Sequence, residues 1–400
     1  MANQTAHWTS TKFSETLIVD ALLKHLLGLM PYGRSDLGEI YEVIVQLKAN
    51  DEETWINAWS VVAERLLRRA EEADRAGKRI TASSTFLRAA TYWRASLLYF
   101  SHPEDMRIAL YAHFSSKCYE RYLELSGDPG TYVEIPYENT FLPGYFYRSP
   151  VAAEKAPLLI LTPGRDTWAE DTCWVYEAAL RRGIHCLVYD GPGQGYALRL
   201  NNLRFRPDWE NVVRPVVDFA LDIPGIDPTR IGLMGLSFGA FLSTRAAAFE
   251  KRLKVCIANP GSISWGRSIL DHFAPPIRQK LVEEGPAFLL QTLTGTAEHA
   301  SLGWLVRDYA WKHGVPQAEV FKALLAYDNT SVIDQIECEM LVMDGTEEMA
   351  RGQAQRLFDA LRCPKHYLLF DDTSTAQAHC QIGAYSTATE YLFSWIDERL

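Results

Sequence analysis

Residues 230–249 read RIGLMGLSFGAFLSTRAAAF, and this stretch decides the fold. Its apolar first part predicts a β-strand, and its alanine-rich last part predicts a helix. Gly235 and Gly239 stand two residues to either side of Ser237, and glycines at these positions allow a strand to turn sharply into a helix without a collision. A serine at such a turn sits in a strained backbone conformation at the end of a sheet. We therefore take Ser237 as the candidate nucleophile.

The chain on both sides of this stretch alternates short apolar runs with helical runs. Two runs around a polar turn, residues 132–136 and 144–148, predict a hairpin. The other expected strands are 158–162, 185–189, 230–234, 254–258, 340–343 and 366–370, and the expected helices between and after them are 170–182, 209–221, 238–252, 352–361 and 380–400. This alternation is typical of an α/β fold with a mostly parallel, doubly wound sheet.

Two parts of the chain do not fit that alternation. From Phe13 to Gly127 the apolar residues recur every three or four positions, which predicts four or five amphipathic helices. Residues 260–335 are too long for a simple crossover, and an insertion between two late strands is a natural place for a lid. We expect an N-terminal helical (cap) domain at 1–130 and an α/β core at 131–400 with a helical lid insertion at 260–335.

A serine hydroxyl needs a base, which in turn needs an acid to orient it. His379 follows the last expected strand and is the only histidine beyond His366, so it is the candidate base. Three carboxylates follow the strand 340–343. Glu348, three residues after a glycine, is the preferred acid, with Glu347 and Asp344 as alternatives.

Negative charge that develops on a substrate oxygen needs fixed N–H donors. The backbone N–H of Phe238, directly after the serine, is one candidate. The loop after the strand 158–162 offers the other at Gly164 or Arg165. The Arg165 side chain could contact an anionic or enolate-like substrate, or pair with Asp166 or Asp171.

Three further residues are tentative substrate contacts: Asp166, Trp168 and Trp265. Tryptophans can line an aromatic site, although most of them fill cores. Residues 190–195, DGPGQG, have neither the register of a dinucleotide loop nor a following Gly-Lys-Ser/Thr. We interpret them as the tight turn after the strand 185–189, close to the site.

Composition excludes several classes of partner. The 40 basic and 50 acidic residues give a net charge of −10, which argues against nucleic acid. No apolar run is long enough for a membrane span, and the start MANQTAHWTS does not resemble a secretory leader. Seven scattered cysteines fit a reducing cytosol. Histidines and cysteines form no ligand cluster, so we expect no metal.

With these motifs placed, the chain resembles one branch of the α/β-hydrolase superfamily. This branch carries an N-terminal helical domain and includes 2,6-dihydroxypseudooxynicotine hydrolase, fungal polyketide-shortening hydrolases and the fermentation-respiration switch esterases. The segments that carry the resemblance are the helical stretch 55–100, the hairpin with 135–138 and 142–145, the loop 163–166, the turn 189–195, the turn 235–239 and the segment 378–381. The branch normally has Asp where Glu348 stands.

The resemblance implies an α/β-hydrolase fold and a cytoplasmic serine hydrolase without a cofactor, often a homodimer. Its small-molecule substrate would be aromatic or polyketide-like and would bind between helical domain, lid and core. The reaction expected is cleavage of a carbon–carbon bond next to a carbonyl, or of an ester, in secondary metabolism or aromatic degradation. A cyclase or condensation enzyme with the same triad is the alternative. A non-catalytic ligand-binding module is a third possibility.

Overall fold

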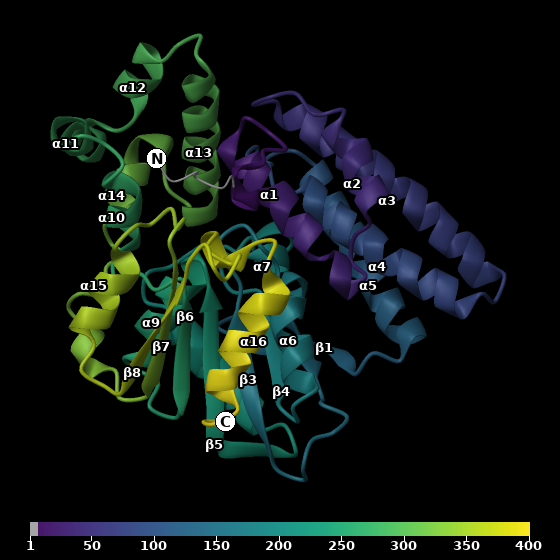
Figure 1. Ribbon diagram of the computed structural model, residues 1–400. Coiled ribbons are helices and arrows are strands. Elements are labelled where there is room, and N and C mark those ends of the chain that lie inside the picture. Colours follow the sequence, from purple (N-terminus) through teal and green to yellow (C-terminus); the bar gives the residue numbers. More distant parts are fainter. Residues whose placement is uncertain (1–6) are drawn as a thin grey trace.

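The computed structural model describes residues 7–400. The first six residues, part of the start on which the expectation about a secretory leader rests, lie outside the described residues. In Figure 1 the helices of the first third and the helices of the insertion lie over the same end of a central sheet. No helix within residues 7–400 is long and apolar enough to cross a membrane.

The first third folds into helices, as the periodicity predicts. Their bounds are α1 Leu17–Gly28, α2 Leu37–Ile44, α3 Glu52–Arg75, α4 Arg79–Ser96 and α5 Arg107–Ser126. The helix α3 begins where the Asp51 carboxylate accepts a hydrogen bond from the Thr54 N–H. Its buried face, with Trp55 and Trp59, packs against α4. We call α1–α5 the helical region.

The rest of the chain forms one eight-stranded sheet in the order β1-β2-β4-β3-β5-β6-β7-β8. The strands are β1 Gly130–Tyr137, β2 Thr140–Tyr147, β3 Ala156–Thr162, β4 His185–Tyr189, β5 Ile226–Leu236, β6 Val255–Asn259, β7 Glu339–Gly345 and β8 Lys365–Phe370. The hairpin β1–β2 is antiparallel, β2 is antiparallel to β4, and the other pairs are parallel. These pairings confirm the predicted mostly parallel sheet. Helices cover both of its faces and bury the apolar strands.

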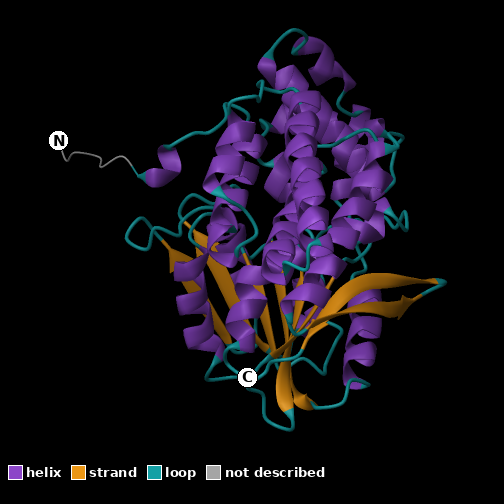
Figure 2. Cartoon of the chain, turned by 90° about the vertical axis from the view of Figure 1, so that its right-hand side faces the viewer, coloured by secondary structure: helices purple, strands orange, loops and turns teal. Residues whose placement is uncertain are grey.

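Helices pack on both faces of the sheet. The face toward the helical region is covered by α6 Cys173–Leu180 and α16 Tyr385–Ile396, and the opposite face by α8 Glu210–Leu221, α9 Phe238–Ala247 and α15 Gln353–Ala360. Figure 2 shows the long hairpin extending away from the other strands. The helix expected from residue 380 begins only at Tyr385, because Cys380 and Gln381 take left-handed φ values of 51° and 53°.

The insertion between β6 and β7 is helical, as predicted. It contains α10 Trp265–Leu270, α11 Pro275–Glu284, α12 Ala287–Thr292, α13 Ala297–His313 and α14 Val320–Leu324, which bury an apolar cluster of their own. The short helix α7 Gly195–Arg199, which follows the turn after β4, was not predicted. Five residues are too few for a helical period to be recognised.

The turn from β5 into α9 explains why its two glycines are needed. A Cβ on Gly235 would lie 2.1 Å from the Gly239 carbonyl oxygen, and a Cβ on Gly239 would lie 2.2 Å from the Pro163 carbonyl oxygen. No side chain fits at either position, because both contacts are with backbone that cannot move aside. These close approaches fix the distance between β5, α9 and the loop after β3.

Replacement of Gly239 by alanine should therefore destabilise the protein by at least about 3 kcal/mol, the upper range for overpacking. Urea unfolding followed by circular dichroism measures this. Gly303→Ala in α13 is the matched control, because the nearest atom to its added Cβ is the flexible end of Arg307 at 3.3 Å. The control should be neutral or slightly stabilising. Equal unfolding midpoints for the two variants would contradict the packing argument.

Candidate active site

Ser237 lies at the turn between β5 and α9 with φ 55° and ψ −124°. A non-glycine residue in this region is strained, and such strain persists only where neighbouring structure holds it. Here the Ser237 N–H donates a hydrogen bond of 2.7 Å to the carbonyl oxygen of Asn259, the last residue of β6. The side chain is thereby presented at the carboxyl end of the sheet.

Two further residues predicted from the sequence meet Ser237. The His379 Nε2 atom lies 2.9 Å from Ser237 Oγ, and its Nδ1 atom lies 2.6 Å from Glu348 Oε1. The histidine follows β8 and the glutamate follows β7, so parallel strands bring the three residues to one edge of the sheet. In this order the imidazole can take the hydroxyl proton, and the carboxylate orients the imidazole and stabilises its charged form.

The three candidate acids have different environments. Glu348 is 3 % exposed and also accepts hydrogen bonds from the N–H groups of Met349 and Ala350. Glu347 is exposed and accepts a hydrogen bond from the Thr9 hydroxyl. The Asp344 carboxylate accepts from the Tyr367 hydroxyl at 2.6 Å and from the Gly345 N–H. Of the three, only Glu348 contacts the imidazole in residues 7–400.

Glu348 and His379 each stabilise the charged form of the other. Burial alone would raise the pKa of Glu348, but the His379 imidazole and two backbone N–H groups lower the pKa below its usual value. Burial would likewise lower the pKa of His379, yet its contacts with the Cys380 sulfur and the Glu348 carboxylate raise the pKa well above 6.5. A carboxylate that stabilises the charged imidazole favours proton uptake by His379.

Sequence reasoning did not assign any role to Asn259, which joins the serine turn to the histidine loop. Its carbonyl oxygen accepts hydrogen bonds from the Ser237 N–H and, at 3.3 Å, from the Cys380 thiol. Its side-chain amide donates to Gln381 Oε1 at 2.8 Å. The Cys380 sulfur also lies 3.6 Å from His379 Nε2. Asn259 directly follows the strand expected at 254–258, which is the one signal that could have indicated it.

The loop after β3, residues 163–168, lies against the serine turn. A Cβ on Gly164 would be 3.1 Å from Ser237 Cβ, and the Gly164 N–H donates to the Thr167 hydroxyl at 3.0 Å. The backbone N–H groups of Arg165 and Phe238 have no acceptor within residues 7–400. The Gln194 amide, from the turn after β4, donates to the carbonyl oxygens of Pro163 and Gly164 and holds this loop.

The charge of the Arg165 side chain is paired with two carboxylates. It forms ion pairs with Asp166 at 3.2 Å and with Asp308 of α13, and it stacks over the Tyr309 ring at 4.0 Å. Lys312 of α13 pairs with the same two carboxylates at 2.6 and 2.9 Å. This four-charge cluster, in which Asp166 is partly exposed, joins the insertion to the loop 163–168. Both carboxylates that contact the Arg165 guanidinium therefore belong to this cluster.

The opposite side of α13 contacts the helical region. Arg307 pairs with Glu52 at 2.5 Å and donates to the Ser101 hydroxyl. Trp304 stacks on Tyr99 with 4.8 Å between ring centres. One helix of the insertion therefore binds both neighbouring parts of the chain.

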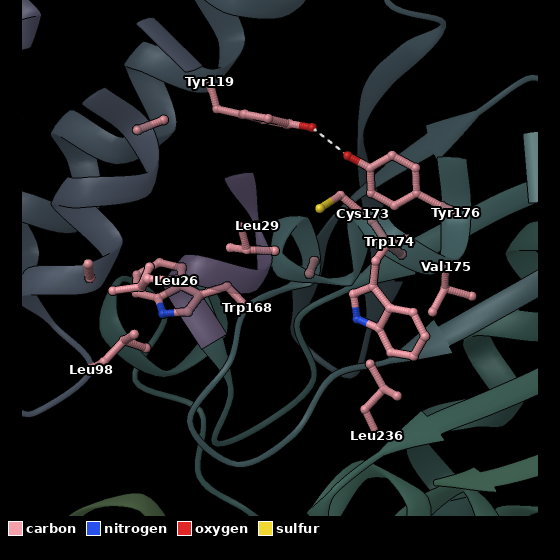
Figure 3. Close-up of a cluster of buried hydrophobic side chains, with 14 of the residues drawn as sticks. Leu26, Leu29, Leu98, Tyr119, Trp168, Cys173, Trp174, Val175, Tyr176 and Leu236 are labelled. Atoms are coloured by element: carbon pink, nitrogen blue, oxygen red, sulfur yellow. Dashed lines mark hydrogen bonds between the residues drawn. The ribbon is translucent and has the colours of Figure 1, made fainter. Parts of the chain in front are cut away.

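Trp168 and Trp265, the two tryptophans predicted as substrate contacts, lie apart from each other. Trp168 is fully buried among residues of the helical region, including Leu26 and Leu98 (Figure 3). Trp265 packs against the Phe238 ring at 4.7 Å on the other side of the serine turn. The candidate Asp166 is held by Arg165 and Lys312, which keep its pKa near 2 although burial would raise it.

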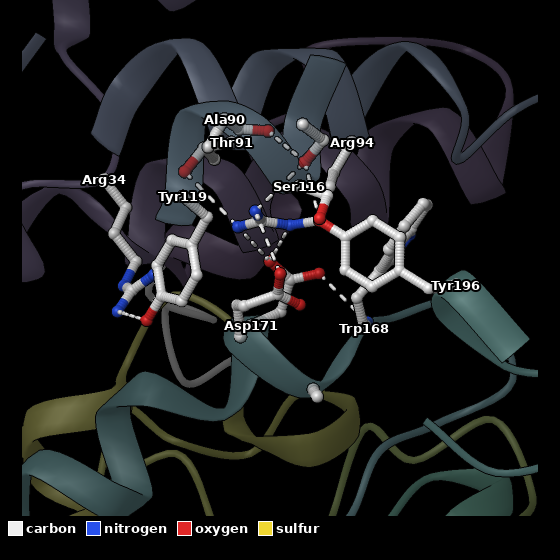
Figure 4. A network of polar contacts seen from close by, with 12 residues as sticks. Arg34, Ala90, Thr91, Arg94, Ser116, Tyr119, Trp168, Asp171 and Tyr196 are labelled. Carbon is white, nitrogen blue, oxygen red and sulfur yellow. Dashed lines mark hydrogen bonds and ion pairs between the residues drawn. The ribbon is translucent and has the colours of Figure 1, made fainter. Parts of the chain in front are cut away.

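Asp171, the other possible partner of Arg165, pairs instead with Arg94 of α4 at 3.1 Å. Figure 4 shows Arg94 reaching from the helical region to this carboxylate, with Tyr196 beside it. Both members of the pair are buried, so the pair fixes the helical region on the core. Within residues 7–400 no group of three or more His, Cys, Asp or Glu side chains is placed to hold a metal ion.

This strand order, with a serine at the turn after β5 and a histidine after β8, defines the α/β-hydrolase fold. The chain belongs to the alpha/beta hydrolase family, whose model matches residues 159–379. The expected resemblance to the branch with an N-terminal helical region is confirmed, and the protein is an enzyme of the hydrolase class.

Relatives match over nearly the full length. The chain is 28 % identical to the alpha/beta hydrolase xenA of Xenoacremonium sinensis, over 96 % of this chain and 97 % of that protein. It is 29 % identical to the 20-hydroxy-prefusarin hydrolase FUS2 of Gibberella moniliformis, over 93 % and 94 %. The crystal structure of 2,6-dihydroxy-pseudo-oxynicotine hydrolase superposes with a TM-score of 0.73 and 18 % identity, over 93 % and 95 %. That structural likeness shows a shared fold.

Glu348→Gln should lower the pKa of His379, because the neutral amide no longer stabilises the charged imidazole. NMR titration of the imidazole protons measures this without any substrate. Glu347→Gln, which changes a carboxylate that contacts Thr9, is the matched control and should leave the titration unchanged. If Glu347→Gln shifted the pKa of His379 and Glu348→Gln did not, Glu347 would be the acid that orients the histidine.

Proposed function

We propose that the protein is a serine hydrolase in which Ser237 is the nucleophile, His379 the base and Glu348 the acid. The continuous contact from Ser237 Oγ through His379 to the buried Glu348 carboxylate is the observation that supports this proposal. The Glu348 carboxylate reaches the imidazole from the loop after β7. Glu has one more methylene than Asp, and this additional length is compatible with the role of the triad acid.

In this mechanism Ser237 Oγ attacks a carbonyl carbon while His379 takes the hydroxyl proton. His379 then gives that proton to the leaving group, and water releases the acyl group from the serine in a second, equivalent step. The backbone N–H groups of Phe238 and Arg165 would hold the oxyanion, because both lack an acceptor in residues 7–400. The Gly164 N–H already donates to Thr167, which favours Arg165 at this position.

The substrate would be a small aromatic or polyketide-like molecule with a cleavable ester, or with a carbon–carbon bond next to a carbonyl. The relative FUS2 is named for hydrolysis of 20-hydroxy-prefusarin, and this chain shares nearly its whole length with that protein. Residues 1–130 would act as a cap domain and 260–335 as a lid over the core. Such enclosure suits one selected small molecule. We also propose a homodimer in the cytoplasm.

Ser237→Ala should reduce turnover by about a thousandfold or more and abolish labelling by a fluorophosphonate probe. Mass spectrometry of the labelled protein locates the adduct. Ser243→Ala is the matched control, since Ser243 lies further along α9 with a buried hydroxyl that has no partner in residues 7–400. Full turnover by Ser237→Ala would refute the serine mechanism. Product mass tests the reaction itself, because hydrolysis adds one water and a cyclising condensation loses one.

Asp308→Asn should lower kcat by about tenfold with a smaller change in KM, because Arg165 loses a charge that fixes the loop carrying its N–H. Steady-state kinetics on protein shown to be folded by circular dichroism measures this. Arg307→Gln weakens the other side of α13, toward Glu52, and should leave kcat closer to the unsubstituted value. Equal losses of kcat in both variants would mean that the lid contributes only stability.

A further inference from the structure

A buried arginine lies where the three parts of the chain meet. Arg199 is the last residue of α7, and its guanidinium donates hydrogen bonds to the carbonyl oxygens of Gly195 in the core and Leu97 in the helical region. The ring of Trp168, from the loop after β3, lies 4.6 Å from the guanidinium carbon, and the ring of Trp311, from the lid helix α13, lies 5.6 Å away.

The charge of Arg199 has no direct counterion. Arg94 and Arg165, which are also buried, each pair with carboxylates within 4.0 Å. Within residues 7–400, Arg199 has no carboxylate at that distance. Burial lowers the pKa of its guanidinium to about 10, against the opposing influence of more distant carboxylates at Asp308, Asp190 and Asp166. An uncompensated buried cation is costly, and two tryptophan faces offset only part of that cost.

Hydrogen-bond donors at this place also lack acceptors. The Arg199 Nε and the Trp168 Nε1 atoms are both buried without a partner in residues 7–400. The two side chains contact each other, so one acceptor group could serve both of them. A buried donor without an acceptor costs free energy, and a group that would lower this cost is negative and accepts hydrogen bonds.

We propose that Arg199 and Trp168 form an anion subsite that binds a planar oxyanion of the substrate, either a carboxylate or an acidic enolate. The inference rests on the proposed function and defines its substrate class as acidic. A planar oxyanion matches the flat edge of a guanidinium group. The carboxylates around Arg199 favour a singly charged group over a phosphate dianion.

The subsite also explains which arginine meets the substrate. The sequence offered Arg165 for a contact with an anion, but its charge is already paired with Asp166 and Asp308. Trp168 stands three residues after Arg165 in the same loop, so an anion at Arg199 lies beside the loop that would supply an oxyanion donor. The acidic group of the substrate would thus be bound next to the reacting carbonyl, in contact with core, helical region and lid.

Isothermal titration of the Ser237→Ala protein with 1-naphthoate and with the neutral 1-naphthalenemethanol tests the subsite without turnover. We expect naphthoate to bind at least about tenfold more tightly than the alcohol. Arg199→Gln in the same background should remove that preference, and Trp168→Phe, which deletes the N–H donor and leaves a smaller aromatic ring, should reduce it. Arg245→Gln, which affects an arginine paired with Glu210 on the opposite face of the sheet, should leave it unchanged.

Equal affinities for acid and alcohol in the Ser237→Ala protein, or an unchanged preference after Arg199→Gln, would overturn the proposal and leave Arg199 as a structural contact. If Arg199→Gln does not fold, Arg199→Lys and Trp168→Phe decide the question. Titration with the enolate of 5,5-dimethyl-1,3-cyclohexanedione distinguishes an enolate site from a carboxylate site. Retained turnover in Ser237→Ala would refute the serine mechanism while these affinities still report on the subsite.

Discussion

The left-handed backbone at Ser237 is the constraint on which the remaining geometry depends. A residue with φ 55° between β5 and α9 brings the helix back so closely that Gly235 and Gly239 can carry no side chain. The same closeness places Gly239 under the Pro163 carbonyl and Gly164 against the serine, so the loop after β3 is positioned by the turn. The Asn259 carbonyl then holds the strained N–H and, through Cys380, the histidine loop. Strain at one residue is balanced by contacts from three strand ends.

Buried ion pairs hold the outer parts of the chain on this centre. Arg94 fixes the helical region to the core through Asp171, and Arg165 fixes the loop after β3 to the insertion through Asp308. Such pairs contribute little net stability, because desolvation offsets their attraction, but a charge left without its partner is strongly destabilising. They therefore specify one relative placement of helical region, insertion and core more than they stabilise it. Arg199, unlike Arg94 and Arg165, has no carboxylate within 4.0 Å in residues 7–400, and this difference supports the proposed anion subsite.

The sequence was sufficient for the sheet, the insertion and the pair Ser237 and His379, because local periodicity and chain order determine these features. It left three acids open, since a loop of adjacent carboxylates carries no periodic signal and only the fold shows that Glu348 alone is turned to the imidazole. It could not pair Arg165 with Asp308, which lies 143 positions away in an insertion whose packing no local pattern describes. Asn259 and Arg199 were missed for a similar reason. Their contacts come from segments far apart in the chain, and single residues at strand and helix ends look ordinary in the sequence.

The helix α13 carries a tryptophan toward each of its neighbours. Trp304 stacks on Tyr99 of the helical region, and Trp311 faces Arg199 of the core. Indole emission responds to stacking and to nearby charge, so the two rings are built-in optical reporters on two different interfaces of the same element. Movement of α13 away from the helical region would alter the emission of one ring, and movement away from the core would alter that of the other. In variants that keep only one of these two rings among the 11 tryptophans, changes at the two interfaces of α13 can thus be followed separately by intrinsic fluorescence.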